Sequence, residues 1–353
     1  MITEIFARRY ANVELRTQYF KEDRVLCNQA WHMLSSGFLW DSYATEKISD
    51  KAEAAFKDVH NVLALELGVE YLSDRWWFRN FEFNGNKNTQ TYTNSYSTIC
   101  KNFMMKIPDE VAKGDGWMKD RISLIELAFA TRGRQVAKAN SELLNSIAKA
   151  EYEERNMPVR GLRVPGSRAD GVRAVNARLN ETYIGLVNDL NERLRLAQYR
   201  LTYHNGLIQL ADDALVSVQI AQPFWALVGN PPWANVDRQM KEAIDCRDTG
   251  DRMAAFHAVS ALESCIKIVS DTKGWTKGTE RGAAAYVSNL VSIKNGAFLK
   301  AWEGELLTKL FSDVRNPFAH GAGQAAMPAM TAEQTNWTID TSMNWIKTLV
   351  RRI

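Results

Sequence analysis

Apolar residues recur at steps of three and four positions along most of the chain. This spacing gives one buried face of an α-helix, so it predicts a chain that is mainly helical. In the first half, such stripes predict helices over 2–10, 25–34, 55–63, 95–105 and 118–148. The segment 76–94 breaks the pattern and ends in a polar run of Gly, Asn and Thr, so we expect a surface loop there.

A second break in the helical pattern lies at 199–210, "YRLTYHNGLIQL", where apolar and polar residues alternate around Asn205-Gly206. Asn-Gly tolerates the positive φ of a two-residue turn, so this stretch predicts a small β-hairpin. The preceding segment, 154–173, holds five arginines among prolines and glycines and predicts a flexible basic loop. Such a loop is either solvated surface or a phosphate-binding segment.

The last third of the chain predicts a small up-and-down helical bundle. Two apolar stripes flank "DTGD" and indicate a helical hairpin that ends near residue 270. Further helices are expected near 279–292, 298–314 and 331–352. We therefore expect a mainly α protein with two helical domains: residues 1–220, with the β-hairpin at the end, and residues 221–353, the bundle.

Composition narrows the class of protein. The 353 residues are 46% hydrophobic and 24% charged, as in a globular protein, and a net charge of +3 permits a nucleic-acid partner. The four cysteines form no CxxC pair and the five histidines no HExxH, so we expect reduced thiols and no metal or other cofactor. No apolar run reaches the ~18 residues of a membrane span, and the N-terminus lacks a signal-peptide core, which predicts a cytoplasmic protein.

One short motif suggests a different chemistry. "ALVGNPPW" (226–233) resembles the (N/D)PP(Y/F/W) motif of adenine-N6 methyltransferases. Those enzymes also need a parallel α/β sheet and a glycine-rich turn for their cofactor, and no βαβ alternation is present in the sequence. The alternative is that Asn230 caps a helix whose first residue is Pro231.

The segment "SDVRNPFAHGAG" (312–323) follows an apolar stripe and carries Arg315, Asn316 and His320. Pro317 disfavours α geometry at Asn316, so we expect the helix to stop or kink there. A break would let Arg315 and His320 face one groove. Histidine can transfer protons at neutral pH and arginine can hold the charge of a phosphorane-like transition state, so the pair suits cleavage of RNA by its own 2′-hydroxyl without a metal. The alternative is a helix-capping arginine and a structural histidine in a turn.

"RNPFAH" resembles the R-[N/H/D]-x-x-x-H motif of the HEPN superfamily of helical ribonucleases, and "DRMAAFHAVSALESCIKIV" is similar to the helix that places Glu263 near that motif in abortive-infection members. The segments "ITEIFARRY", "DRVLCNQAWHML" and "LNERLRLAQYRLTYHNGLIQL" resemble the AbiJ N-terminal domain with its hairpin. The resemblance implies that Arg315 and His320 are catalytic, that Asn316 is the polar motif residue and that Glu263 supports the site.

The resemblance further implies an endoribonuclease that acts as the toxin of an abortive-infection response against phage, on RNA such as tRNA, as a homodimer with a composite site. An antitoxin or a phage-derived trigger would control it. The alternative is a non-catalytic HEPN module for RNA binding or dimerisation. Candidate RNA-binding residues are Lys273, Lys277, Arg281, Arg160, Arg163 and Arg168. The tryptophans, among them Trp76 and Trp77, are expected mostly in the core, with a few exposed to stack on bases.

Overall fold

The structure is a computed structural model that describes residues 5–35, 49–83, 86–156, 167–211, 220–319 and 328–353. The chain divides into two compact units, residues 1–208 and 209–353. The division falls before residue 220, where the sequence pattern placed the boundary. As the sequence predicted, the protein is mainly α-helical.

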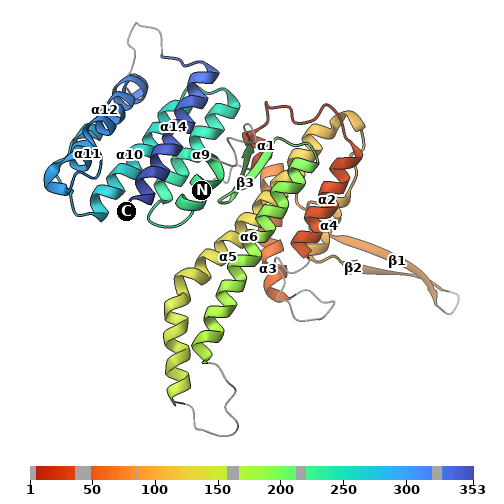
Figure 1. Cartoon of the computed structure of the whole chain (residues 1–353). Helices are drawn as coiled ribbons and strands as arrows, with labels where there is room; N and C mark the ends of the chain where they lie inside the picture. Colours follow the sequence, from red (N-terminus) through yellow and green to blue (C-terminus); the bar gives the residue numbers. More distant parts are fainter. Residues whose placement is uncertain (1–4, 36–48, 84–85, 157–166, 212–219, 320–327) are drawn as a thin grey trace. The chain divides into compact units, whose positions relative to one another are not determined.

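The first unit is built from helices and one projecting β-hairpin (Figure 1). A second, shorter hairpin, β3 with β4, joins the two units along the chain. The elements are α1 (Phe6–Arg9), α2 (Lys21–Met33), α3 (Asp50–Leu67), β1 (Trp76–Phe83), β2 (Asn86–Thr93), α4 (Tyr96–Met105), η2 (Val111–Lys113), α5 (Gly114–Asn156), α6 (Arg168–Leu196), β3 (Leu201–His204) and β4 (Leu207–Leu210).

The second unit is a helical bundle in which α10 is the central helix, packed against α9, α11 and α14 (Figure 1). Its elements are α8 (Gln222–Val228), α9 (Ala234–Thr249), α10 (Ala254–Thr272), α11 (Gly282–Val291), η4 (Ile293–Asn295), α12 (Ala301–Leu310), η5 (Phe311–Arg315), α13 (Asn316–Ala319) and α14 (Ala332–Arg351). The helices expected near 279–292, 298–314 and 331–352 are confirmed as α11, α12 with η5, and α14.

The core of the bundle follows from the apolar stripes of these helices. In α10, Val259, Leu262 and Ile266 are fully buried, and they lie on the side of the helix that faces α9 and α14. The predicted turn between α9 and α10 is present, since Gly250 ends α9 in the left-handed conformation with a φ of 74°. Thr331 begins α14 with a capping box, because its hydroxyl accepts a hydrogen bond from the Gln334 amide while the Gln334 side chain accepts one from the Thr331 amide.

The interior of the first unit contains an ion pair as well as apolar side chains. Arg9 in α1 donates two hydrogen bonds to Glu126 in α5, at 3.0 and 2.7 Å, and a third to the Ile208 carbonyl at 3.0 Å. The Ile208 amide donates to the same carboxylate at 2.6 Å. Both charged side chains are buried, so these bonds replace the water that both charges lose on folding.

The segment 76–94 is the main correction to the predicted fold. The structure has an antiparallel hairpin there, β1 with β2, in the register Trp76 opposite Thr93 to Phe83 opposite Asn86. The surface-loop prediction was wrong because neither strand alternates between apolar and polar residues. Aromatic residues occupy both faces of β1, and β2 consists mostly of polar residues. The useful signal was Asn84-Gly85 between two runs of equal length, a common hairpin sequence.

The other predicted hairpin is confirmed as β3 and β4, with Asn205 and Gly206 both at positive φ in the turn. His204, the last residue of β3 before the turn, is buried, at 7% exposure. The reason is that β3 packs on the helices, where the Tyr203 ring meets Phe129 edge-on at 5.3 Å.

The two ends of the predicted basic loop are helical. Helix α5 continues to Asn156 and α6 begins at Arg168, capped by Ser167, whose hydroxyl accepts a hydrogen bond from the Asp170 amide at 3.0 Å. Residues 157–166, which include Arg160 and Arg163, lie outside the described residues.

Candidate functional site

The segment of the predicted motif begins in a π-helical turn. Residues Phe311–Arg315 form η5, in which the Asn316 amide donates to the Phe311 carbonyl five residues earlier. Asn316 itself has helical angles, φ −60° and ψ −40°, and α13 continues through Pro317. The helix therefore does not stop at Asn316. The wider π turn gives the proline ring room that a regular helix would deny it, and such turns are frequent at functional sites.

Arg315 lies at the end of this turn and faces α10. Its guanidinium Nη2 is 2.9 Å from Oε2 of Glu263, and the group sits 5.8 Å from the centre of the Phe256 ring. The Glu263 side chain is 7% exposed, whereas that of Arg315 is 27% exposed. The carboxylate thus lies inside the bundle, while the guanidinium it holds reaches the surface.

Helix α10 presents more of this site along one face. Phe256, Ser260, Glu263 and Lys267 follow at helical spacing, so their side chains share a stripe. Lys267 places its Nζ 2.9 Å from the other Glu263 oxygen, and its ammonium lies 5.7 Å from the centre of the Tyr286 ring in α11. Ser260 is 7% exposed, and its hydroxyl makes no hydrogen bond within the described residues.

One carboxylate therefore joins two cations, so Glu263, Arg315 and Lys267 carry a net charge of +1. Sequence reasoning missed Lys267. The signal was its position four residues after Glu263, a common ion-pair spacing on a helix. Arg315 also keeps a buried Nε without a hydrogen-bond partner among the described residues. The cluster thus retains one positive charge in excess, on two side chains that are partly exposed.

The remaining motif residues lie beside this cluster in sequence. Asn316, directly after Arg315, is exposed. His320 follows α13 immediately and lies outside the described residues.

The basic residues proposed after the Glu263 helix lie at its far end. Lys273 is the C-cap of α10, where its ammonium donates to the Ile353 carbonyl at 3.1 Å, and Lys277 and Arg281 follow in the exposed turn before α11. Ten residues of helix separate Glu263 from Lys273, which is about 15 Å along the axis. These three cations are thus not part of the Arg315 cluster. Arg168 belongs to the first unit, where it pairs with Glu153 at 3.4 Å.

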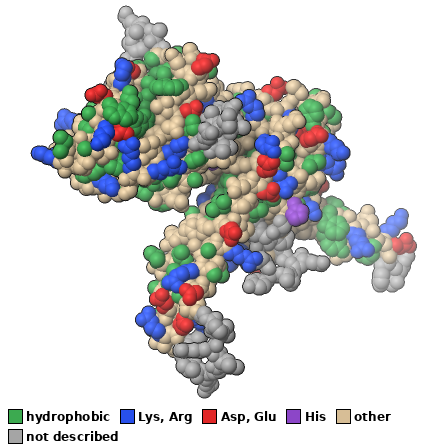
Figure 2. Space-filling view, in the orientation of Figure 1, with side chains coloured by type: hydrophobic (Ala, Val, Ile, Leu, Met, Phe, Trp, Pro, Cys, Tyr) green, Lys and Arg blue, Asp and Glu red, His purple; other side chains and the backbone are tan. Residues whose placement is uncertain are grey.

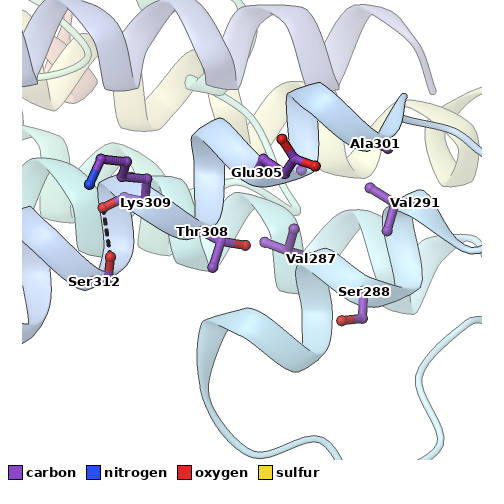
Figure 3. Close-up of a pocket in the computed structure, with 9 residues that line it drawn as sticks. Val287, Ser288, Val291, Ala301, Glu305, Thr308, Lys309 and Ser312 are labelled. Carbon is purple, nitrogen blue, oxygen red and sulfur yellow. Dashed lines mark hydrogen bonds between the residues drawn. The ribbon is translucent and has the colours of Figure 1, made fainter.

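The cavity of the bundle is a different feature from this cluster. A hollow of about 580 Å³ lies between α11 and α12, with Val287 and Val291 among its apolar lining and Glu305 and Lys309 from α12 beside them (Figure 3). Ser312, which donates to the Lys309 carbonyl at 3.0 Å, closes one end. Among the described residues, neither a histidine nor an arginine lines it, so Arg315 is not part of this hollow.

The methyltransferase reading of "GNPPW" has no support in the fold. The described residues contain two separate two-stranded antiparallel sheets, and neither is the parallel sheet those enzymes require. The capping reading was also wrong. Asn230 opens a turn in which the Trp233 amide donates to its carbonyl at 3.1 Å, and α9 begins only at Ala234.

Within the described ranges, no three His, Cys, Asp or Glu side chains gather in a way that could hold a metal ion. None of the helices in the same ranges combines the length and apolarity needed to cross a bilayer.

Comparison with known proteins adds a family for the larger part of the chain. Residues 4–226 match the family described as AbiJ N-terminal domain 4, which covers the first unit and the start of the second. No curated protein and no solved structure matches the chain significantly. The chain belongs to the AbiJ N-terminal domain 4 family, which connects it with abortive-infection defence.

Proposed function

We propose that the second unit is a metal-independent endoribonuclease of the HEPN type, and that the chain acts as the toxic effector of an abortive-infection response. The observation that carries the proposal is the ion pair between Arg315 and Glu263, 2.9 Å long, at the start of the "RNPFAH" segment. The pair brings together Glu263 of α10 and Arg315 of the motif, which belong to two segments that each resemble HEPN sequences.

In this mechanism Arg315 stabilises the transition state. Attack of the ribose 2′-hydroxyl on the adjacent phosphorus adds negative charge to the phosphoryl oxygens. A guanidinium offers several donors in a fixed plane, and Glu263 engages only one of its terminal nitrogens. The carboxylate and the Phe256 ring hold the group in place, so little entropy is lost when RNA arrives.

Lys267 supplies the second positive charge of the cluster. Without it, Glu263 would neutralise Arg315 and leave no net attraction for phosphate. With it, the cluster keeps a charge of +1, and Lys267 is 43% exposed, within reach of a bound backbone. Lys267 lies one helical turn after Glu263 on α10 and contacts the same carboxylate as Arg315. We therefore expect Lys267 to bind the RNA backbone next to Arg315.

His320 is proposed as the group that moves the proton. An imidazole with its usual pKa near 6.5 takes a proton from the 2′-hydroxyl, or gives one to the leaving 5′-oxygen, at neutral pH. One histidine performs only one of these steps at a time. A homodimer in which two motifs face one cleft would supply both, and we include that assembly in the proposal. Asn316, exposed beside Arg315, would contact the phosphate.

The test is cleavage of total RNA or tRNA by the purified full-length protein in EDTA, followed by analysis of the RNA ends. We expect products with 2′,3′-cyclic phosphates and 5′-hydroxyls, because the 2′-oxygen is the nucleophile. His320→Ala should lose cleavage, whereas His32→Ala, which removes an exposed histidine of α2, should keep it.

Equal cleavage by His320→Ala and the wild type would refute the proposal. If neither protein cleaves but both bind RNA equally, the non-catalytic module is supported instead. Ends with a 3′-hydroxyl would also contradict the mechanism, because they require water rather than the 2′-hydroxyl as the nucleophile.

A further inference from the structure

The β1–β2 hairpin of the first unit presents one face that is built from aromatic and basic side chains. Partners in an antiparallel pair share a face, and the register places Trp77 opposite Tyr92, Arg79 opposite Gln90 and Phe81 opposite Asn88. Figure 1 shows the hairpin projecting away from the helices of its own unit. We call these six residues the aromatic face.

The aromatic side chains of this face are exposed, against the expectation that the tryptophans lie mostly in the core. Trp77 is 46% exposed and Phe81 is 40% exposed. The Trp77 and Tyr92 rings stack in parallel, 4.3 Å apart with an interplanar angle of 12°. One side of the indole is covered by Tyr92, and the stack can continue on the other side with one more flat ring.

The charge of the aromatic face is positive. Arg79 lies between Trp77 and Phe81 and forms no ion pair within the described part of the chain. The carboxylate of the hairpin, Glu82, belongs to the opposite face, where it lies across from Lys87. The space-filling view shows hydrophobic and basic side chains together on this hairpin (Figure 2). An anionic ligand with flat rings therefore matches the face.

A hollow at the base of the hairpin is also lined by basic and aromatic side chains. It measures about 440 Å³ and is lined by Lys57 and Arg75 together with Thr93, Asn94, Ser95 and Tyr96. Both cations lie over the Tyr96 ring, at 5.8 and 4.8 Å from its centre, and neither has an ion-pair partner among the described residues. Glu53, also in the lining, is engaged by the backbone amides of Tyr96 and Ser97 at the start of α4.

We propose that the aromatic face binds single-stranded RNA, with one base stacked on Trp77, a second on Phe81, Arg79 at the phosphate between them, and the strand continuing to Lys57 and Arg75. Stacking needs unpaired bases, because a duplex keeps its ring faces covered. The amide of Gln90 lies beside Arg79 on the same face and can contact a ribose 2′-hydroxyl, which DNA lacks. A hydrophobic protein partner would leave Arg79 desolvated without a counter-charge.

The test is fluorescence anisotropy of a short labelled single-stranded RNA with the full-length protein carrying His320→Ala. This variant keeps the probe intact, so the result does not depend on whether the chain cleaves RNA. The double variant Trp77→Ala with Phe81→Ala should weaken binding about tenfold or more, because it removes both rings on which bases stack. Tyr152→Ala, which removes an exposed aromatic from α5, is the matched control and should bind like the parent protein.

Arg79→Ala is the second variant, because it leaves both aromatic rings and the Trp77–Tyr92 stack in place if the double variant disturbs the hairpin. It should weaken binding severalfold and lower the salt dependence of the affinity. Duplex RNA and single-stranded DNA of the same sequence should bind more weakly than the RNA strand.

Three results would overturn the proposal. One is equal RNA affinity of the parent, the double variant and Arg79→Ala. Another is duplex RNA or the DNA strand binding as tightly as single-stranded RNA. The third is a change of oligomeric state in the double variant, measured by sedimentation, with unchanged RNA affinity, which would make the face a contact between two copies of the chain.

Discussion

Each unit of the protein contains an arginine paired with a glutamate, and the two pairs differ in what surrounds them. Arg9 and Glu126 are buried, at 6% and 3% exposure, and main-chain groups of Ile208 add hydrogen bonds to both side chains. Arg315 and Glu263 are 27% and 7% exposed, and the second charge near the carboxylate is Lys267 rather than the backbone.

Under the proposed function, the difference separates an ion pair that stabilises the fold from one that positions Arg315 for RNA. In the first pair, both side chains are buried, so neither charge is accessible to an outside partner. In the second, the carboxylate is buried but holds two cations that reach the surface. We therefore expect loss of Arg9 to affect stability first, and loss of Arg315 to affect RNA chemistry first.

The largest effect on stability should come from Arg9→Ala. The change leaves Glu126 charged and buried without its partner, so the free energy of unfolding should fall by roughly 3–5 kcal/mol. Arg168→Ala is the matched control, since Arg168 and Glu153 form an exposed pair, at 47% and 44% exposure. Its cost should stay below about 1 kcal/mol. Denaturant unfolding measures both, and similar losses in the two variants would contradict the distinction between buried and exposed pairs.

Asp120 offers a second test of buried charge in the first unit, because it differs from Glu126 in its surroundings. It is a largely buried carboxyl of α5 without an ion-pair partner in the described structure. Burial raises its pKa to about 6, although Arg121 lowers it in part. The folded protein therefore binds this proton more tightly than the unfolded chain, and stability falls as the pH rises from about 4 to about 6. Asp120→Asn should be more stable than the wild type above pH 6, by up to about 3 kcal/mol.

Thermal unfolding of the wild type and Asp120→Asn across pH 4–8 measures this effect. The two stability curves should converge as the pH falls toward the unfolded-state pKa of about 4, because Asp120 then becomes protonated in both states. A constant difference at every pH would show that the carboxyl does not titrate as its burial requires.

Glu263→Gln should reduce RNA cleavage by roughly tenfold to a hundredfold, because an amide holds Arg315 less firmly than a carboxylate does. Glu263 acts through Arg315, so the pH at which His320 titrates in the rate profile should stay unchanged. The control is Glu242→Gln in α9, whose carboxylate pairs with Arg238 at 2.8 Å. Cleavage by Glu263→Gln at the wild-type rate would contradict the role of Glu263 in positioning Arg315.

The smallest effect is expected for Lys267→Ala. Removing one phosphate contact should weaken RNA binding severalfold and reduce the slope of log affinity against log salt by about 1. Lys309→Ala is the control, because Lys309 is an exposed lysine that pairs with Asp313 on its own helix segment. If the slope of log affinity against log salt is the same for Lys267→Ala and Lys309→Ala, the RNA backbone does not contact Lys267.

The sequence predicted the helices well where one apolar stripe faced one core, as in α3, α10 and α14. It failed for the β1–β2 hairpin, since that hairpin buries neither face and so has no alternation to read. It also misjudged Asn316, because the rule for residues before proline assumes a regular helix, and a π turn changes the geometry.

For the site, the resemblance placed Glu263 near Arg315, and the structure has the two side chains in contact. Lys267 was not expected, because its role depends on Arg315 arriving from another helix at the same carboxylate. The sequence also did not show that three cations lie away from the cluster, namely Lys273, Lys277 and Arg281. Their distance depends on how far α10 continues after Glu263.

Cleavage by Arg315→Ala, measured together with its thermal unfolding, tests the central claim most directly. We expect the rate of RNA cleavage in EDTA to fall by a factor of about 10²–10³, as when a transition-state donor is removed, while the melting temperature changes little. Arg351→Ala, which removes an exposed arginine at the end of α14, should retain the wild-type rate. Cleavage by Arg315→Ala at the wild-type rate would contradict the account.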